Sequence, residues 1–371
     1  MFDAEAIADE FCELVRIDSL SGQELKLAML LIERLRDIGL AVHFDEAGKP
    51  IDGQVGNLWA TIPASAEGLP AIMLNAHMDT VKPGSGIQPV REGDIISSAG
   101  DTILGADDKA GLAIILAVVR KLIKENPSHG DIHIVFTIAE ETGLTGARNM
   151  DYDSFHADYA LVLDGGQDFA VYTAAPSAVR ITYTITGEAA HSGVCPEKGI
   201  SAIQAAAIAI ADMELGRIDE RTTANVGIIS GGEARNIIPP SCTVQAEARS
   251  HDADKLSAQV AHMRSCMEAA CEQVGALLQV EEPHSYHAFD LPDDHPLVAV
   301  ALEVAADLGH KAETLRGGGG SDANVFNERG IPAIIMPTGA ATAHTLDETL
   351  DVPKMAASAE YLYEVIVRLQ Q

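Results

Sequence analysis

The chain has 371 residues, with 25 Lys and Arg against 55 Asp and Glu, so its formal net charge is −30. This charge argues against binding to nucleic acid or to an anionic membrane surface. A hydrophobic content of 47% excludes a largely disordered chain, and the length favours two domains over one.

Targeting and cysteine signals are also informative. The first residues, "MFDAEAIADEF", are acidic and do not have the pattern of a signal peptide. The longest apolar run, residues 110–119, is far shorter than the about 20 residues that cross a bilayer. The five cysteines are scattered and form no CxxC pair, which disfavours a disulfide framework or a thiolate zinc site. We therefore expect a cytoplasmic protein.

The first half of the chain has the pattern of an α/β domain. Residues 3–16 and 22–37 predict amphipathic helices, the second with a capping box formed by Ser21 and Glu24. Short apolar runs that mostly do not alternate with polar residues predict strands buried on both faces. These runs are residues 58–62, 71–74, 132–138, 159–163 and 331–336. A helix predicted over 108–125 lies between them, and such interleaving indicates layered α/β architecture.

The middle of the chain has a different pattern. "RITYTIT" at residues 180–186 alternates polar and apolar residues, as a half-exposed antiparallel strand does. The predicted elements that follow are a helix over 200–213, strands over 225–229 and 243–249, a helix over 253–274 and a strand over 277–282. This β-α-β-β-α-β order is the ferredoxin-like unit. We expect an inserted domain over 176–288 and a discontinuous domain over 1–175 and 289–371.

Acidic residues and histidines follow the predicted buried strands. They are His77 and Asp79, Glu140 and Glu141, Asp164, and His344, while Asp107 begins the 108–125 helix. In open α/β sheets, ligands bind outside the carboxyl ends of the strands. We therefore expect these side chains to converge on one site.

Five clustered carboxylates cannot all ionise without compensating charge, and the segments contain few bases. Two imidazoles with carboxylates favour Zn²⁺, Co²⁺ or Mn²⁺ over Ca²⁺. Hydrolytic sites commonly hold two such ions about 3.5–4 Å apart. Each motif alone has an ordinary explanation, such as a helix cap for "ADD" or a turn for "DGG". Their repeated placement after strands favours a metal site.

A family resemblance adds to this interpretation. The segments "HMDTV", "GADDKAG", "AEETGLTGA", "LDGG", "GEAAHSGVCPEKGISAI", "ARNIIPPS", "GGGGSDA" and "AHTLDE" occur in this order. They resemble the di-zinc aminoacylase and carboxypeptidase family, which includes peptidase T, acetylornithine deacetylase, succinyl-diaminopimelate desuccinylase and carboxypeptidase G. The resemblance spans about residues 5 to 370 and is nearest to the peptidase T-like branch. It implies a zinc-exopeptidase-like catalytic domain, with a mixed sheet flanked by helices, and an inserted ferredoxin-like α+β domain that serves as a lid and dimerises.

The resemblance also implies roles for individual residues. His77, Asp107 and Asp164 would bind one zinc ion, and Glu141, His344 and the bridging Asp107 would bind the other. Co²⁺ or Mn²⁺ are possible substitutes for the two Zn²⁺ ions per subunit. Asp79 would orient the His77 imidazole, and Glu140 would act as the general base toward a water activated by zinc. The peptide bond between Asp107 and Asp108 would be cis.

Further residues are expected to act on the substrate. The resemblance implies that His191, in "AAHSG", reaches the active site of the partner in a homodimer and stabilises the oxyanion. Asn236 and Arg249 would contact the substrate, with Arg249 suited to a carboxylate. Gly319 and Ser321 belong to a glycine-rich loop that would offer backbone N–H groups.

The preferred interpretation is a di-zinc exopeptidase, an aminopeptidase or tripeptidase, acting on short peptides. An N-acyl amino acid deacylase or desuccinylase remains an alternative, since Arg249 would suit substrates with a free carboxylate. A metal-binding but inactive homologue is disfavoured because Asp79 and Glu140 accompany the ligands. A solute-binding protein is disfavoured by the N-terminal sequence.

Overall fold

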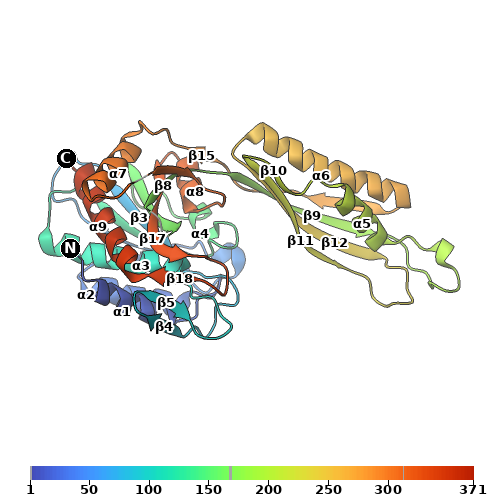
Figure 1. Ribbon diagram of the computed structural model, residues 1–371, viewed down its shortest axis with the longest axis horizontal. Helices are drawn as coiled ribbons and strands as arrows, with labels where there is room; N and C mark the ends of the chain where they lie inside the picture. The colour runs from blue at the N-terminus through green and yellow to red at the C-terminus, as the bar shows by residue number, and fades with distance from the viewer. Residues whose placement is uncertain (1, 167–168, 312) are drawn as a thin grey trace. The chain divides into compact units, whose positions relative to one another are not determined.

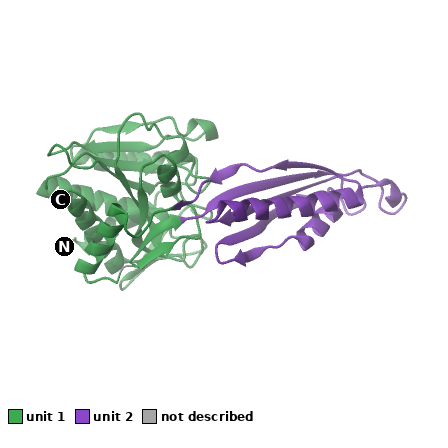
Figure 2. Cartoon of the chain, turned by 90° about the horizontal axis from the view of Figure 1, so that it is seen from above, with its two compact units in different colours: residues 1–174, 290–371 green, residues 175–289 purple. Residues whose placement is uncertain are grey.

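The computed structural model describes residues 2–166, 169–311 and 313–371. It contains two compact units, coloured separately in Figure 2. Unit 1 comprises Met1–Ala174 and Asp290–Gln371, and unit 2 comprises Ala175–Phe289. Each unit has its own cluster of buried hydrophobic side chains. Unit 2 is thus inserted into the sequence of unit 1.

The centre of the unit 1 sheet consists of four parallel strands. In spatial order they are β6 (Ile132–Thr137), β3 (Ile72–His77), β7 (Tyr159–Gly166) and β17 (Ala333–Ala341). Every residue of β3 and β6 is buried, as the continuous apolar runs predict. Because the four strands are parallel, their carboxyl ends lie at one edge of the sheet, where the site forms.

Shorter strands extend this centre on both sides. On the β6 side they are β2 (Leu58–Ile62) and β1 (Val42–Phe44); on the β17 side they are β18 (Thr349–Asp351), β5 (Ile95–Ser98) and β4 (Pro89–Glu92). Off this path lie β8 (Ala170–Ala175), β15 (Phe289–Asp290) and β16 (Glu313–Arg316). Antiparallel pairs such as β2 with β6 make the whole sheet mixed, and this confirms the predicted sheet class.

Four helices of unit 1 pack together, and two of them, residues 106–125 and 352–369, contact the central strands (Figure 1). They are α1 (Ala4–Val15), α3 (Ala106–Glu125), α7 (Pro296–Asp307) and α9 (Val352–Leu369). The remaining helices of unit 1 are α2 (Leu25–Asp37), α4 (Thr145–Arg148), α8 (Asp322–Glu328) and the 3₁₀ turn η1 (Lys49–Ile51). Across the described part of the chain, no helix is both long and apolar enough to cross a membrane.

The predicted capping box at the start of α2 is wrong. Glu24 is the N-cap residue, and its side chain makes no cap hydrogen bond. The Ser21 hydroxyl instead donates to Asp79 Oδ2 at 2.6 Å. The Glu24 carboxylate accepts the N–H groups of Gly22 and Ala139. Ser21 therefore contacts the loop after β3 and Glu24 the loop after β6, and neither side chain caps the helix.

Unit 2 contains the predicted β-α-β-β-α-β series, to which the structure adds two short strands, residues 216–219 and 284–286. Its elements are β9 (Ser177–Thr186), η2 (Pro196–Lys198), α5 (Ala202–Asp212), β10 (Gly216–Asp219), β11 (Thr222–Gly231), β12 (Ser241–Ser250), α6 (Ala253–Val274), β13 (Leu277–Glu281) and β14 (His284–Tyr286). The antiparallel sheet has the order β10-β11-β12-β9-β13. Helices α5 and α6 pack on each other and on the sheet. This is the ferredoxin-like arrangement.

Candidate active site

His77 is the last residue of β3 and is 2% exposed. Its Nε2 lies 3.0 Å from Asp107 Oδ1. Its Nδ1 lies 2.9 Å from the backbone carbonyl oxygen of Asp79 and 3.4 Å from Asp79 Oδ1. Burial alone lowers the pKa of His77, but the two carboxylates outweigh it and raise the pKa well above its usual value. The contacts of the two ring nitrogens orient the imidazole with Nε2 toward Asp107.

The Asp79 carboxylate holds the turn that follows β6. Its Oδ1 accepts the N–H of Glu140 at 2.9 Å, and its Oδ2 accepts the N–H of Glu141 at 3.3 Å. The predicted orienting contact to His77 is made at shorter range by the Asp79 carbonyl. Asp79 thus connects the end of β3 to the paired glutamates.

Asp107 lies between the two histidines. Oδ1 faces His77, and Oδ2 is 3.1 Å from Nε2 of His344. The backbone at Asp107 and Asp108 is not helical, although both residues fall within α3. The predicted cis peptide bond between them is confirmed. A carboxylate with one oxygen toward each imidazole has the placement of a bridging ligand.

Glu141 and His344 complete this group, with Nε2 of His344 2.8 Å from Glu141 Oε1. Donor atoms of His77, Asp107 and Glu141 all lie within 4.8 Å of one another. Zinc bonds to nitrogen and oxygen are about 2.0–2.2 Å long, so tetrahedral neighbours lie roughly 3.3 Å apart. The separations of 3.0 Å from His77 to Asp107, 3.1 Å from Asp107 to His344 and 2.8 Å from His344 to Glu141 are close to this spacing, so these nitrogen and oxygen donors could hold transition-metal ions.

The electrostatics of the group also favour cations. Burial, with repulsion from Asp164 and Glu141, raises the pKa of Glu140 well above its usual value. Burial and the neighbouring Asp107 raise the pKa of Asp164 in the same way. Hydrogen bonds to Asp107 and Glu141 raise the pKa of His344 to about 10. In the absence of metal, the site gathers protons to balance its carboxylates, and divalent ions would supply that charge.

Asp164 lies near the end of β7 and is hydrogen-bonded by Ser321. Ser321 is buried and caps α8 by accepting the N–H of Ala323. The Ser321 side chain therefore lies against a predicted metal ligand, whereas its predicted role is substrate binding. Gly319, two residues earlier, is exposed and keeps its backbone accessible.

Glu348 is a residue of the site to which the sequence reasoning gave no role. Its carboxylate is 1% exposed and accepts three backbone N–H groups, from Leu104 (2.8 Å), Gly105 (2.7 Å) and Asp107 (3.0 Å). Glu348 lies four residues after His344 and bonds the backbone of Asp107. It therefore connects the segment that carries His344 to the segment that carries Asp107. The signal was its place in "AHTLDE", where only the histidine was assigned.

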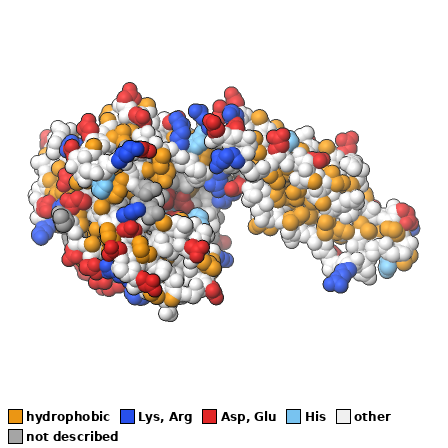
Figure 3. All heavy atoms as spheres, in the orientation of Figure 1, with side chains coloured by type: hydrophobic (Ala, Val, Ile, Leu, Met, Phe, Trp, Pro, Cys, Tyr) orange, Lys and Arg blue, Asp and Glu red, His pale blue; other side chains and the backbone are white. Residues whose placement is uncertain are grey.

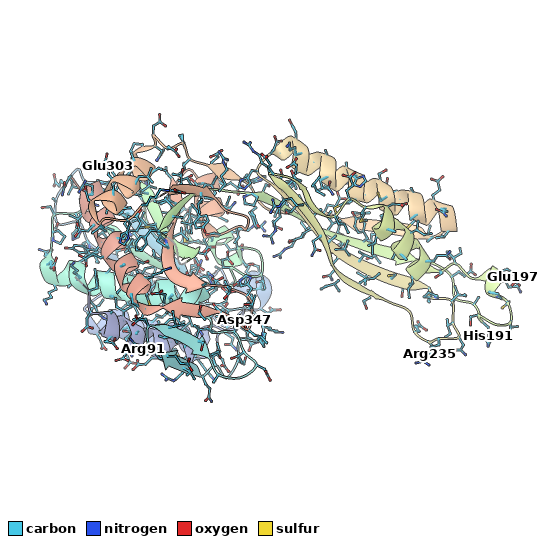
Figure 4. The ribbon with its side chains drawn as sticks, viewed as in Figure 1. Arg91, His191, Glu197, Arg235, Glu303 and Asp347 are labelled. Carbon is cyan, nitrogen blue, oxygen red and sulfur yellow. The ribbon has the colours of Figure 1, made fainter. Side chains whose placement is uncertain are left out.

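The predicted residues of unit 2 lie at two opposite ends of its sheet. His191 follows the end of β9 and Asn236 precedes β12, where the Ser192 N–H donates to the Asn236 carbonyl. Both are exposed, and Figure 4 shows His191 beside Arg235 in the terminal loops of unit 2. Arg249 is at the other end of β12, paired with Ala178 near the start of β9. Eight residues of strand separate Arg249 from Ser241, which corresponds to about 27 Å.

Arg249 has an acidic partner within unit 2. Its Nε and a terminal nitrogen donate to the two oxygens of Glu247, both at 3.1 Å. A bidentate pair of this kind is the geometry in which Arg binds a carboxylate. A substrate carboxylate would therefore compete with Glu247 for Arg249.

Imidazoles and carboxylates grouped at the carboxyl ends of parallel strands, where they could hold metal ions, are the arrangement expected of a metallohydrolase. Residues 73–368 match the model of Peptidase family M20/M25/M40. The Bacillus subtilis (strain 168) protein YqjE is 38% identical over 367 residues, covering 99% of each chain. The chain belongs to this peptidase family and is a peptide hydrolase.

Two solved structures are similar over the full length of both chains. Aminopeptidase PepT from Bacillus cereus ATCC 10987 has a TM-score of 0.87 and 39% identity. A tripeptidase from Staphylococcus aureus subsp. aureus Mu50 has a TM-score of 0.92 and 37% identity. These similarities confirm the predicted family and fold class.

Proposed function

We propose that this protein is a cytoplasmic exopeptidase that removes residues from short peptides and uses two divalent ions, with Zn²⁺ as the native metal. The observation that carries the proposal is the different placement of two adjacent glutamates, Glu140 and Glu141, after the end of β6. Glu141 contacts His344 within the ligand group, whereas Glu140 is adjacent, buried and held by its backbone to Asp79. A protein that only binds metal needs no more than the metal ligands. Glu140 is additional to them and can accept and donate a proton, as catalysis requires.

One ion would be held by His77, Asp107 and Asp164 and the other by Asp107, Glu141 and His344. When bound, the ions activate water and polarise the scissile carbonyl. Glu140 accepts the proton of the attacking water and then delivers it to the leaving amine. Its buried surroundings favour the protonated form, which suits the second transfer. Asp79 keeps Glu140 in place through the backbone N–H.

A homodimer is part of the proposal. His191 and Asn236 lie beyond the Ser241 end of β12, and Arg249 is about 27 Å along the strand from Ser241, so these three residues do not line one pocket within unit 2. A second subunit would supply His191 to the oxyanion and Asn236 to the substrate.

Strand β11 offers a surface for that second copy. β10 pairs only with its first residues, Thr222–Ala224, and the described strands leave the rest of that edge unpaired. Ile228 and Ile229 on this stretch are 56% and 52% exposed. Figure 3 shows hydrophobic side chains gathered on unit 2. An exposed apolar edge strand is a template for pairing with another chain, and a symmetric copy of β11 would fill it.

Peptides are favoured over N-acyl amino acids as substrates for two reasons. Glu247 already engages Arg249, which weakens the case for a site built around a free carboxylate. Aminopeptidase PepT and the tripeptidase, at 39% and 37% identity, act on peptides according to their names.

A substrate panel tests the proposal. Metal-stripped protein would be supplied with Zn²⁺, Co²⁺ or Mn²⁺ and assayed on di- and tripeptides with free or blocked N-termini, and on N-acetyl and N-succinyl amino acids. Cleavage confined to free-amine peptides is expected. Cleavage of the N-acyl compounds instead would identify a deacylase, and silence with every metal would indicate an inactive homologue.

A further inference from the structure

Unit 1 contains a pocket of about 350 Å³ directly beside the candidate metal ligands. Asp107 and Asp164 lie on its wall, but Glu140 and Glu141 do not line it. The pocket is therefore lined by two of the candidate ligands but not by the proposed base. Its volume is near the lower end of the about 300–1,000 Å³ found for small-molecule sites, which suits one side chain rather than a whole peptide.

The lining beyond the aspartates is uncharged. It consists of glycine, alanine and threonine residues, with Tyr172 and Leu315 as the large side chains. Of its acidic members, Asp108 already accepts the N–H groups of His77 and Gly111. Asp107 and Asp164 are proposed metal ligands, and the lining offers no basic group to an acidic substrate side chain. With those two carboxylates bound to ions and Asp108 already hydrogen-bonded, a Lys ammonium would meet mainly uncharged groups, at a desolvation cost.

We propose that this pocket receives the apolar side chain of the substrate residue next to the scissile bond, and that Gly166 sets the space available to it. This inference rests on the proposed function and adds the substrate class. Tyr172 and Leu315 are paired in register between β8 and β16, so they lie on the same face and form one wall.

The two glycines at the end of β7 differ in what a side chain would meet. A Cβ on Gly166 would lie 3.8 Å from the Ala340 carbonyl and 3.9 Å from the Tyr172 hydroxyl, both ordinary contacts with pocket-lining residues. A Cβ on Gly165 would lie 2.5 Å from the Met336 carbonyl and would force a shift. A Cβ at Gly166 therefore takes up space in the pocket without a close contact, whereas a Cβ at Gly165 does not fit.

The test uses tripeptides X-Gly-Gly and Gly-X-Gly, with X as Ala, Leu, Phe, Glu or Lys, and the metal-loaded enzyme. Wild-type kcat/KM should be higher for Leu and Phe than for Glu and Lys in at least one series. Gly166→Val should lower the Leu-to-Ala and Phe-to-Ala ratios in that series at least tenfold, within the range expected for misfit in an apolar pocket. Leu315→Ala should raise the Phe-to-Ala ratio. Thr314→Ala, on the same strand but facing the other way, should leave the ratios unchanged.

Several results would overturn the inference. Equal preference for Glu and Leu in both series, or a Gly166→Val variant whose kcat/KM falls equally for every substrate, would do so. If Gly166→Val does not fold, an unchanged Phe-to-Ala ratio in Leu315→Ala decides against the pocket. A wild-type enzyme that cleaves no tripeptide would instead refute the proposed function.

Discussion

Replacing Glu348 with Gln should weaken metal binding although Glu348 is not a metal ligand. Its two carboxylate oxygens accept three backbone N–H groups, one of them from Asp107 itself. The Gln side chain keeps one acceptor oxygen, but its NH₂ group would face a backbone N–H. At least one hydrogen bond from a backbone N–H to the charged carboxylate is therefore lost. Such bonds contribute about 1.5–3 kcal/mol each.

The expected consequence is a displaced Asp107 loop and a tenfold to hundredfold weaker affinity for the ions, the range typical when a partner of a metal ligand is removed. Calorimetric titration of metal-stripped protein with Zn²⁺ measures the Kd directly, and the melting temperature of the metal-free protein reports on folding. Asp347→Asn is the matched control, because Asp347 is the exposed neighbour labelled in Figure 4 and changes the charge equally. A Kd within twofold of wild type for Glu348→Gln would refute the reasoning.

Four further predictions follow from the structure. Glu140→Gln should retain both metals by elemental analysis but lose about 10²–10⁴ in kcat, the usual worth of a general base; normal turnover would remove Glu140 from that role. Metal binding should release protons below about pH 10, because His344 must be neutral to bind and its pKa is raised from 6.5 to about 10. Calorimetry in buffers of different ionisation enthalpy measures this release, and its absence would show that the imidazole is not a ligand. In the metal-free protein, the charged His344 stabilises the fold fully below about pH 6.5, and this contribution is lost as the pH rises through about 10. Between these pH values, the melting temperature should fall more in the wild type than in His344→Ala. Ile229→Lys on the β11 edge should yield monomers by sedimentation and little activity, whereas an active monomer would contradict a site completed by a second subunit.

Much of the site could be predicted because its residues follow long apolar runs. The strands ending at His77 and before Glu140 are buried along their whole length, so their boundaries are visible in the sequence. The parallel order of β6, β3, β7 and β17 then brings their carboxyl ends together. Asp107 was predictable from its position before a long helix.

Other features depend on contacts between distant segments, which no local pattern shows. Ser21 has the spacing of a helix cap, yet its hydroxyl bonds Asp79, 58 residues away. Glu348 reaches a loop more than 240 residues away. Strands β4 and β16 are short and largely exposed, so they lack the apolar run that marks the central strands. The separation of His191 from Arg249 follows from the register of β9 with β12, which sequence does not give.

In the proposed function, metal ions at this site drive peptide hydrolysis. The most direct test is to add Zn²⁺ stepwise to chelator-stripped protein and to follow cleavage of a free-amine tripeptide after each addition. Hydrolysis should be negligible without metal and rise until two equivalents per subunit are bound, with Glu140→Gln binding the same two equivalents and remaining inactive. Full activity of the stripped protein, or equal activity of Glu140→Gln, would contradict the account.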